Sequence, residues 1–276
     1  MNSELKKDFY QSVSANRVIL GEKITEFRHF RLFKLNCLKQ TENSLIFEYI
    51  LLDQKMEGTA LIHQWTKDLE LLQNRLLFKT DLYGNIISIE NISELQNKWK
   101  SEFKSFLTKK YTQEGSRQLI ENTEQILYNK QEFEQQFFGY SFLRTLFHGY
   151  YNVKELTESS LSLKNYFGQL DLELSIQSKK ENNNITNTAV LNKELFKQKE
   201  FTQLIRDITH TYNLKVDLTI DLEEIFSFNE QGQIKESSLY LETAVPDIYY
   251  IITAHQTSLV EQEKHKNTLN LELWEN

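Results

Sequence analysis

Histidine is the side chain that most often binds metals, and it exchanges protons near neutral pH. The six histidines are therefore the first candidates for chemistry. No two are spaced as HxH, HxxxH or HExxH, so the sequence predicts no metal site and no cofactor. His148 lies in an aromatic stretch and has a catalytic interpretation, although packing beside Phe147 and Tyr150 is the favoured one. The full set is His29, His63, His148, His210, His255 and His265.

Acidic residues between positions 217 and 224 form the second candidate group. Asp217, Asp221 and Glu223 would share one face of a strand, and paired carboxylates can perform acid–base chemistry or bind calcium. The alternate positions from Val216 to Leu222 are apolar, which favours acids on the solvent side of an antiparallel sheet. GxSxG, GxGxxG and P-loop patterns are also missing, so we expect a protein that is not an enzyme. A hydrolase would require His148 or these acids to converge on one pocket.

Composition argues against further kinds of partner and site. A formal net charge of −7 opposes binding to nucleic acid, which depends on neutralising phosphates, so no nucleic-acid partner is expected. Cys37 is the only cysteine, which rules out an intramolecular disulfide and a cysteine-based zinc site. Its place in a strand-like stretch predicts a buried structural thiol. Apolar residues make up 39% of the chain, which is typical of a globular protein with a large core.

The start of the chain has no apolar stretch of the kind found in export signals. No run of about 18 apolar residues occurs, so no transmembrane segment is predicted. As given, the chain is expected in the cytoplasm, and in the periplasm or as a lipoprotein only if an export signal was removed.

One local pattern occurs twice, at 77–86 and at 225–234. Both stretches read aliphatic-Phe-x-x-(Asp/Asn)-x-x-Gly-(amide)-Ile. Asp or Asn opens a turn by accepting backbone hydrogen bonds, and a Gly three places later supplies the positive φ of a bulged hairpin loop. The sequence therefore predicts equivalent antiparallel hairpins over 77–90 and 225–239, with Gly84 and Gly232 in the left-handed conformation.

Hydrophobic spacing places further elements around these turns. Residues 1–17 are expected to form a short helix or a loose arm. Helical spacing over 91–128 predicts two antiparallel helices, the first of which buries Leu95, Trp99, Phe103 and Phe106 on one face. A helix ending near Tyr212 and an ambiguous, helix-like stretch at 59–72 complete the helical set. Alternation predicts strands over 26–53 with a turn at 39–43, and at 170–177, 185–196, 214–228, 237–245, 248–259 and around Leu269, Leu271 and Leu273.

Each half repeats strand, turn, strand, short helix, strand, Gly turn, strand. This order predicts an α+β fold of antiparallel sheets, in which two related β-meander halves form a half-barrel-like arrangement with a helical hairpin between them. The expected parts are an N-terminal half with the helical hairpin (1–130), an aromatic-rich connecting segment (131–167) and a C-terminal half (168–276).

Two parts of the chain resemble the lipoprotein-carrier (LolA-like) half-barrel superfamily. They are Leu77 to Asn91, followed by a helix beginning at Ser93, and Ile225 to Leu239. The pattern is also similar to uncharacterised Bacteroidota proteins of that type. The resemblance implies an antiparallel sheet wrapped around helices, an apolar groove and export from the cytoplasm. It carries over no binding residue.

The aromatic stretch 133–167 is interpreted as core between the halves or, alternatively, as a binding surface. The first functional hypothesis is a non-catalytic bacterial interaction protein (an adaptor, a chaperone or an immunity-type protein) that binds a protein partner through this stretch or an open sheet edge. The alternative is a carrier of apolar small molecules or lipid between sheet and helices. The candidate binding residues are Phe137, Phe138, Tyr140, Phe142, Phe147, His148, Tyr150 and Tyr151.

Overall fold

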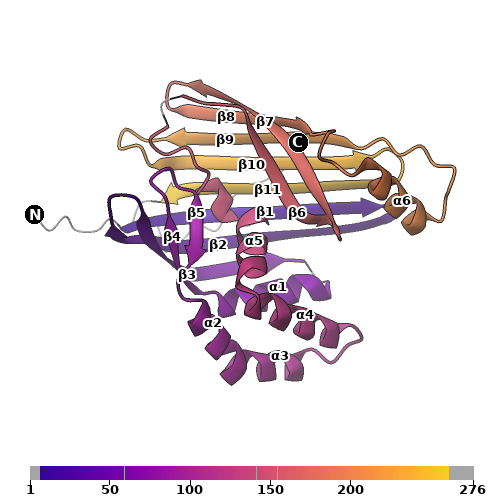
Figure 1. Ribbon diagram of the computed structural model, residues 1–276. Coiled ribbons are helices and arrows are strands. Elements are labelled where there is room, and N and C mark those ends of the chain that lie inside the picture. The colour runs from indigo at the N-terminus through magenta and orange to yellow at the C-terminus, as the bar shows by residue number, and fades with distance from the viewer. Residues whose placement is uncertain (1–6, 59, 141, 154, 261–276) are drawn as a thin grey trace, which may run out of the picture.

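The computed structural model describes residues 7–58, 60–140, 142–153 and 155–260, with the backbone alone for 136–140. Its main feature is one eleven-stranded sheet in which every neighbouring pair is antiparallel (Figure 1). The expected strand around Leu269, Leu271 and Leu273 lies outside the described residues, as does His265. From edge to edge the strands are β5 (Ile86–Ile89), β4 (Arg75–Thr80), β3 (Leu45–Glu57), β2 (Lys23–Gln40), β1 (Lys7–Leu20), β11 (Tyr249–Val260), β10 (Ile234–Val245), β9 (Thr219–Phe228), β8 (Asn184–Leu191), β7 (Leu170–Glu181) and β6 (Ser159–Phe167).

The central strand β1 corrects the prediction of a helix or loose arm over 1–17. Tyr10 pairs with Phe33 of β2 on one side and with Leu259 of β11 on the other, so β1 joins the two halves of the chain in one sheet. The prediction was wrong because the inward positions after Tyr10 are Ser12 and Ser14, which break the apolar alternation of a half-buried strand.

The sheet curls toward one face. The Tyr166 Oη of β6 lies 3.3 Å from the Thr243 Oγ1 of β10, although β7, β8 and β9 separate these strands in the sheet. Leu163 and Leu172 pack in one buried cluster with Leu239 of β10. The sheet stays open, with β5 and β6 as its edges in the described part of the chain. The antiparallel, helix-containing class is confirmed in this coarse form, a β-dominated open sheet with a small share of helix.

Most helices gather beside the N-terminal half of the sheet, whereas the helix over 198–209 packs against C-terminal strands (Figure 1). The predicted helical pair over 91–128 is present. Leu95 and Trp99 are buried and Phe103 is partly buried, but Phe106 is 44% exposed, so the predicted four-residue stripe is wrong at its end. A π-helical turn is the reason, because its extra residue moves the inward position from Phe106 to Leu107. The helices are α1 (Leu61–Leu72), α2 (Ile92–Lys98), the π turn η1 (Trp99–Phe103), α3 (Lys104–Lys110), α4 (Ser116–Tyr128), α5 (Lys130–Tyr140), the 3₁₀ turn η2 (Phe142–Thr145) and α6 (Gln198–Thr209).

The repeated hairpin is confirmed in its hydrogen bonding. Gly84 and Gly232 have φ of 89° and 72°. Asp81 Oδ1 accepts hydrogen bonds from the backbone N–H groups two and four residues later, and Asn229 Oδ1 does the same in the second turn. The flanking strands pair antiparallel in both places, β4 with β5 and β9 with β10. The turn chemistry alone therefore specified two hairpins far apart in the chain.

The acidic strand begins later than predicted, since β9 starts at Thr219 and not at Leu214. Asp217, Asp221 and Glu223 are exposed, as the alternation predicts. Glu224 points the other way and is fully buried. Arg144 of η2 neutralises it through Nε–Oε1 and Nη2–Oε2 hydrogen bonds of 2.7 and 3.2 Å. This ion pair fixes η2 against the sheet, and the aromatic segment that follows η2 is held in place with it.

Candidate functional site

A cavity of about 250 Å³ lies at the end of the sheet where both Gly turns are found. We call it the turn cavity. Its walls come from β1, β2, β3, the two turns and the segment after η2, so both halves of the chain contribute. The lining residues are Asp8, Tyr10, Leu35, Cys37, Leu45, Phe47, Thr80, Leu82, Gly84, Phe147, Tyr151, Asn152, Gly232 and Gln233.

The segment after η2 is fastened to the first Gly turn. The Tyr151 backbone N–H donates to Tyr83 O over 3.0 Å, and Asn152 Nδ2 donates to Leu82 O over 2.9 Å. The Tyr151 ring lies directly over Gly84, where an added Cβ would come within 2.4 Å of Tyr151 Cδ2. Gly84 thus serves both the positive φ of its turn and the close approach of the ring. This contact forms one wall of the turn cavity.

Aromatic rings form the inner part of the cavity. Phe147 packs edge-on against Phe47 and Phe78, with ring centroids 5.1 and 4.9 Å apart. Tyr10 stacks on Phe33 at 5.7 Å and is buried. Edge-to-face and offset arrangements of this kind are favourable beyond the burial of area. The rings therefore give the cavity a rigid apolar wall.

Polar side chains also line the same cavity. The Asp8 carboxylate accepts a hydrogen bond of 2.6 Å from the Gln233 amide of the second Gly turn. Burial, and then the charge of Asp8, raise the pKa of Tyr151 well above its usual range. Burial likewise raises the pKa of Tyr10, so both phenols stay protonated near neutral pH. Among the described lining residues, Asp8 is the one Asp, Glu, Lys, Arg or His.

Cys37 corrects the prediction of a buried thiol, because it is half-buried and lines the turn cavity. Burial raises the pKa of its thiol, which keeps it protonated and poorly nucleophilic near neutral pH. The site assigns it no chemistry of its own, but its position makes it a natural reporter of what occupies the cavity.

The candidate binding residues divide between core and cavity. Phe142 and Phe147 are buried in the main core, and Phe147 with Tyr151 lines the turn cavity. Tyr150 is half-buried beside the same core, and its hydroxyl lies 3.2 Å from Ser178 Oγ. The side chains of Phe137, Phe138 and Tyr140 lie outside the described residues.

His148 packs among aromatic rings, with its centroid 4.2 Å from that of Phe226. Its Nδ1 accepts a hydrogen bond of 3.0 Å from the Tyr150 backbone N–H, while its Nε2 is inaccessible and has no hydrogen-bond partner in the described part of the chain. Burial, assisted by the Arg144 charge, lowers the pKa of His148 to about 3. Neither a carboxylate nor a hydroxyl is among its described hydrogen-bond partners. The geometry is that of a neutral packed ring.

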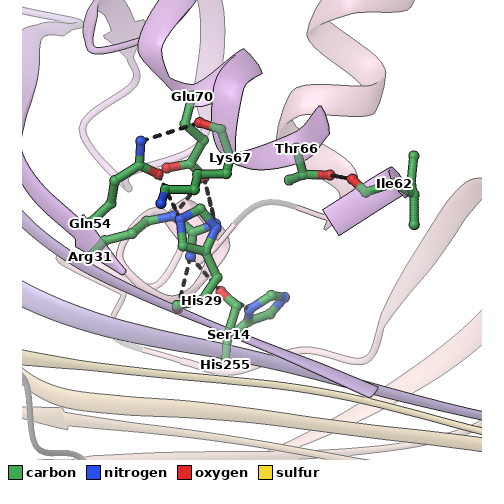
Figure 2. A network of polar contacts seen from close by, with 9 residues as sticks. All are labelled: Ser14, His29, Arg31, Gln54, Ile62, Thr66, Lys67, Glu70 and His255. Atoms are coloured by element: carbon green, nitrogen blue, oxygen red, sulfur yellow. Dashed lines mark hydrogen bonds and ion pairs between the residues drawn. The ribbon is translucent and has the colours of Figure 1, made fainter. Parts of the chain in front are cut away.

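A second polar cluster lies under α1 (Figure 2). Arg31 donates to Glu70 Oε1 over 2.6 Å from Nε and to Ser14 Oγ over 2.8 Å from Nη1, and its Nη2 lies 2.7 Å from His29 Nδ1. Arg31 is always a donor, so this His29 nitrogen must accept. Ser14 also lies 2.9 Å from His255 Nδ1.

Desolvation first, and then the Arg31 charge, lower the pKa of His29 to about 4. Its Nε2 lies 2.9 Å from Gln54 Oε1, so the neutral ring donates there. The cluster joins α1 to β1, β2, β3 and β11, and each side chain in it contacts at least one other, while Glu70 Oε2 is buried with no hydrogen-bond partner in the described part of the chain. We interpret it as the fastening of α1 to the sheet.

Among the described residues, no helix is long and apolar enough to cross a membrane. No group of three or more His, Cys, Asp or Glu side chains within those ranges is arranged to hold a metal ion.

Sequence comparisons give no relative. No family model matches the chain. No curated protein matches it significantly. The resemblance to lipoprotein-carrier half-barrels therefore stays a prediction, although an open, curled antiparallel sheet beside helices is the coarse architecture that it implies.

Structural comparisons give weak likenesses. A structure that describes lipid–protein interactions in lipovitellin is 10% identical, with a TM-score of 0.45, and the match covers 92% of this chain and 25% of that one. This chain therefore spans about a quarter of the lipovitellin chain. A DUF1329 family protein from Desulfovibrio piger is 7% identical with a TM-score of 0.17, over 93% of this chain and 88% of that one. At these TM-scores neither likeness carries an argument about fold or function.

Most of the cavity-lining residues were not predicted from the sequence. Asp8 and Tyr10 lie in the segment expected to form a short helix or a loose arm, and Leu45 and Gln233 were expected as parts of strands and turns. The paired Gly turns were the signal that could have found it, because both turns line the cavity.

Proposed function

We propose that this protein binds an apolar small molecule in the turn cavity and acts as a carrier or receptor for it. The observation that carries the proposal is a cavity whose walls are mainly aromatic and aliphatic, with a few polar groups among them. Apolar walls with a small number of placed polar groups are the usual make-up of small-molecule sites.

The size of the turn cavity limits its occupant. Its volume of about 250 Å³ equals the share of roughly eight waters in the liquid, just below the range of about 300–1,000 Å³ for drug-sized sites. A single hydrocarbon arm or one ring system fits this space, and a lipid with two chains would leave much of its surface outside. The proposal is therefore a site for one apolar arm.

The alternative hypothesis of a carrier is favoured here over the adaptor, chaperone or immunity-type protein. That first hypothesis placed a protein partner on the aromatic stretch or on an open sheet edge. Phe142 and Phe147 instead pack into the core, and Tyr151 covers the first Gly turn. The described aromatic side chains of this stretch are buried or half-buried, which supports the carrier over a protein partner, and a protein partner stays a prediction.

The test uses the neutral fluorescent probe N-phenyl-1-naphthylamine. Wild type should bind it saturably, and Leu45→Trp, which fills the cavity, should weaken binding by about tenfold or more, equivalent to about 1.4 kcal/mol. The matched control is Ile24→Trp, at a site 57% exposed on β2 and outside the cavity lining. Equal binding by Leu45→Trp and wild type would overturn the proposal.

Cys37 supplies an independent readout, because it is the only cysteine and lines the cavity. Its rate of reaction with a small aromatic disulfide reagent should fall when the probe is bound. An unchanged rate at saturating probe would place the probe elsewhere and would also contradict the proposal.

A further inference from the structure

The face of the sheet opposite the main core, which we call the outer face, carries its charges in separate regions. Cross-strand partners point to the same face, so the register of each strand pair places their side chains. On β9 and β10 the register sets Asp221 opposite Glu242, and Glu223 lies on the same face. Acidic side chains therefore lie close together on the outer face of the C-terminal half.

Lysines occupy the outer face of the N-terminal half, at the end of the sheet where the turn cavity lies. Ile46 of β3 pairs with Lys39 of β2 on one side and with Lys79 of β4 on the other. With neighbouring strands about 4.8 Å apart, these two lysines are about 10 Å from each other. Farther along β2, Lys34 pairs with Phe9 of β1, and its Nζ lies 5.9 Å from the centroid of that ring. What we call the basic patch consists of Lys7, Lys34, Lys39 and Lys79.

The basic patch is not neutralised from within. One acid, Glu48, lies inside it, and Arg75 Nε donates to Glu48 Oε1 over 2.8 Å, while Arg75 Nη1 lies 3.1 Å from Glu94 Oε2. In the described part of the chain no ion pair engages a lysine of the patch, and two of the four are exposed and two half-buried. Glu42, in the turn after β2, and Glu90, after β5, are exposed at its rim. The lysines thus remain available to an anionic surface that approaches the outer face.

The basic patch and the turn cavity share one end of the sheet. Lys7 directly precedes Asp8, and Lys79 directly precedes Thr80, and both following residues line the cavity. Successive side chains of a strand point to opposite faces, so these lysines point outward where their neighbours point toward the cavity. A surface that meets the patch therefore lies at the same end of the sheet as the cavity.

Exposed apolar side chains lie beside the basic patch. Leu38, where the register between β2 and β3 shifts, is 40% exposed, and Tyr83 of the first Gly turn is 50% exposed. Lysines next to exposed aliphatic and aromatic side chains are typical of protein surfaces that lie on anionic membranes. The phosphates of a nucleic acid would match the lysines but would leave these apolar side chains without a partner.

We infer that the basic patch docks this protein on an anionic lipid bilayer, with Leu38 and Tyr83 at the lipid interface. The acids of the C-terminal half do not oppose this docking, because β10 lies three strands from β2, about 14 Å away, and charge acts over about 10 Å at 0.1 M salt. The inference goes beyond the proposed function and stands apart from it, since docking needs no occupant in the turn cavity.

The experiment is co-sedimentation with vesicles of phosphatidylcholine alone and of phosphatidylcholine mixed with phosphatidylglycerol. Wild type should bind the mixed vesicles more tightly by about tenfold or more, because each lysine near an anionic surface contributes about fivefold to the partition coefficient. Replacing two lysines together, Lys39→Gln with Lys79→Gln, should weaken this binding by about tenfold or more. Binding should also fall as salt is raised, since the lysines are then screened from the lipid charge.

The matched control is Lys100→Gln with Lys109→Gln, which removes the same charge from exposed positions on η1 and α3 and should bind as wild type does. Equal binding to neutral and mixed vesicles would overturn the inference, and so would equal losses in the two double variants. Binding to a short DNA duplex but not to vesicles would assign the patch to nucleic acid and would overturn it too. The wild-type comparison decides the inference even if Lys39→Gln with Lys79→Gln does not fold. Binding of N-phenyl-1-naphthylamine, measured without vesicles, decides the proposed function separately.

Discussion

The two Gly turns provide a matched pair in which one physical effect can be isolated. Gly84 and Gly232 have φ of 89° and 72°, but an added Cβ meets Tyr151 at 2.4 Å in the first turn and nothing within 4 Å in the second. Gly232→Ala should therefore lower the free energy of unfolding by about 1–2 kcal/mol, the penalty of a left-handed backbone for an L-residue. Gly84→Ala should lower it by that amount plus about 1–3 kcal/mol for displacing a packed ring.

The assay is urea unfolding of both variants, each repeated in a Tyr151→Ala background. Truncating Tyr151 removes the atoms that the new Cβ would meet, so Gly84→Ala should then cost no more than Gly232→Ala. Probe binding should fall with Gly84→Ala in the native background, because Tyr151 is a cavity wall. Equal costs for the two single variants, or no relief in the Tyr151→Ala background, would refute the proposed contact between ring and turn.

Three further outcomes follow from burial and charge. Trp99→Ala should lower the free energy of unfolding measured in urea by about 3–5 kcal/mol, whereas Phe106→Ala should change it by no more than about 0.5 kcal/mol. Equal losses in the two variants would place the π turn elsewhere. Glu224→Gln should cost about 3–5 kcal/mol, since it leaves Arg144 without its buried counter-charge, and adding Arg144→Met should recover part of this loss; no recovery would contradict the pairing. The folded pKa of His148, about 3, lies below the ordinary 6.5, so its contribution to stability is present above pH 6.5 and is lost as pH falls toward 3. His148→Phe should therefore reduce the pH slope of the unfolding free energy in this window by about 1.4 kcal/mol per pH unit, and an unchanged slope would show that the folded ring titrates normally.

Local chemistry determined a large part of the fold. An Asp or Asn followed three residues later by Gly specified both hairpins, since the side-chain oxygen and the positive φ act within five residues. Strict alternation from Leu170 to Ile176 specified β7, and helical spacing around Trp99 specified the helical pair. These features depend on neighbours in sequence, so one sequence was enough to predict them.

Long-range contacts decided the rest. β1 is a strand because β2 and β11 supply its hydrogen bonds, and Ser14 pairs there with His255, a residue 241 positions away. The alternation of β9 placed Glu224 on the inner face, but only the fold brings Arg144 to it. The turn cavity has the same origin: Asp8, Tyr151 and Gln233 meet because the sheet pairs β1 with β11, and no periodicity in the sequence records that meeting. Turns and strands could thus be predicted from local patterns, whereas the cavity and its charge arise in three dimensions, because burial and electrostatic partners depend on which distant segments lie side by side.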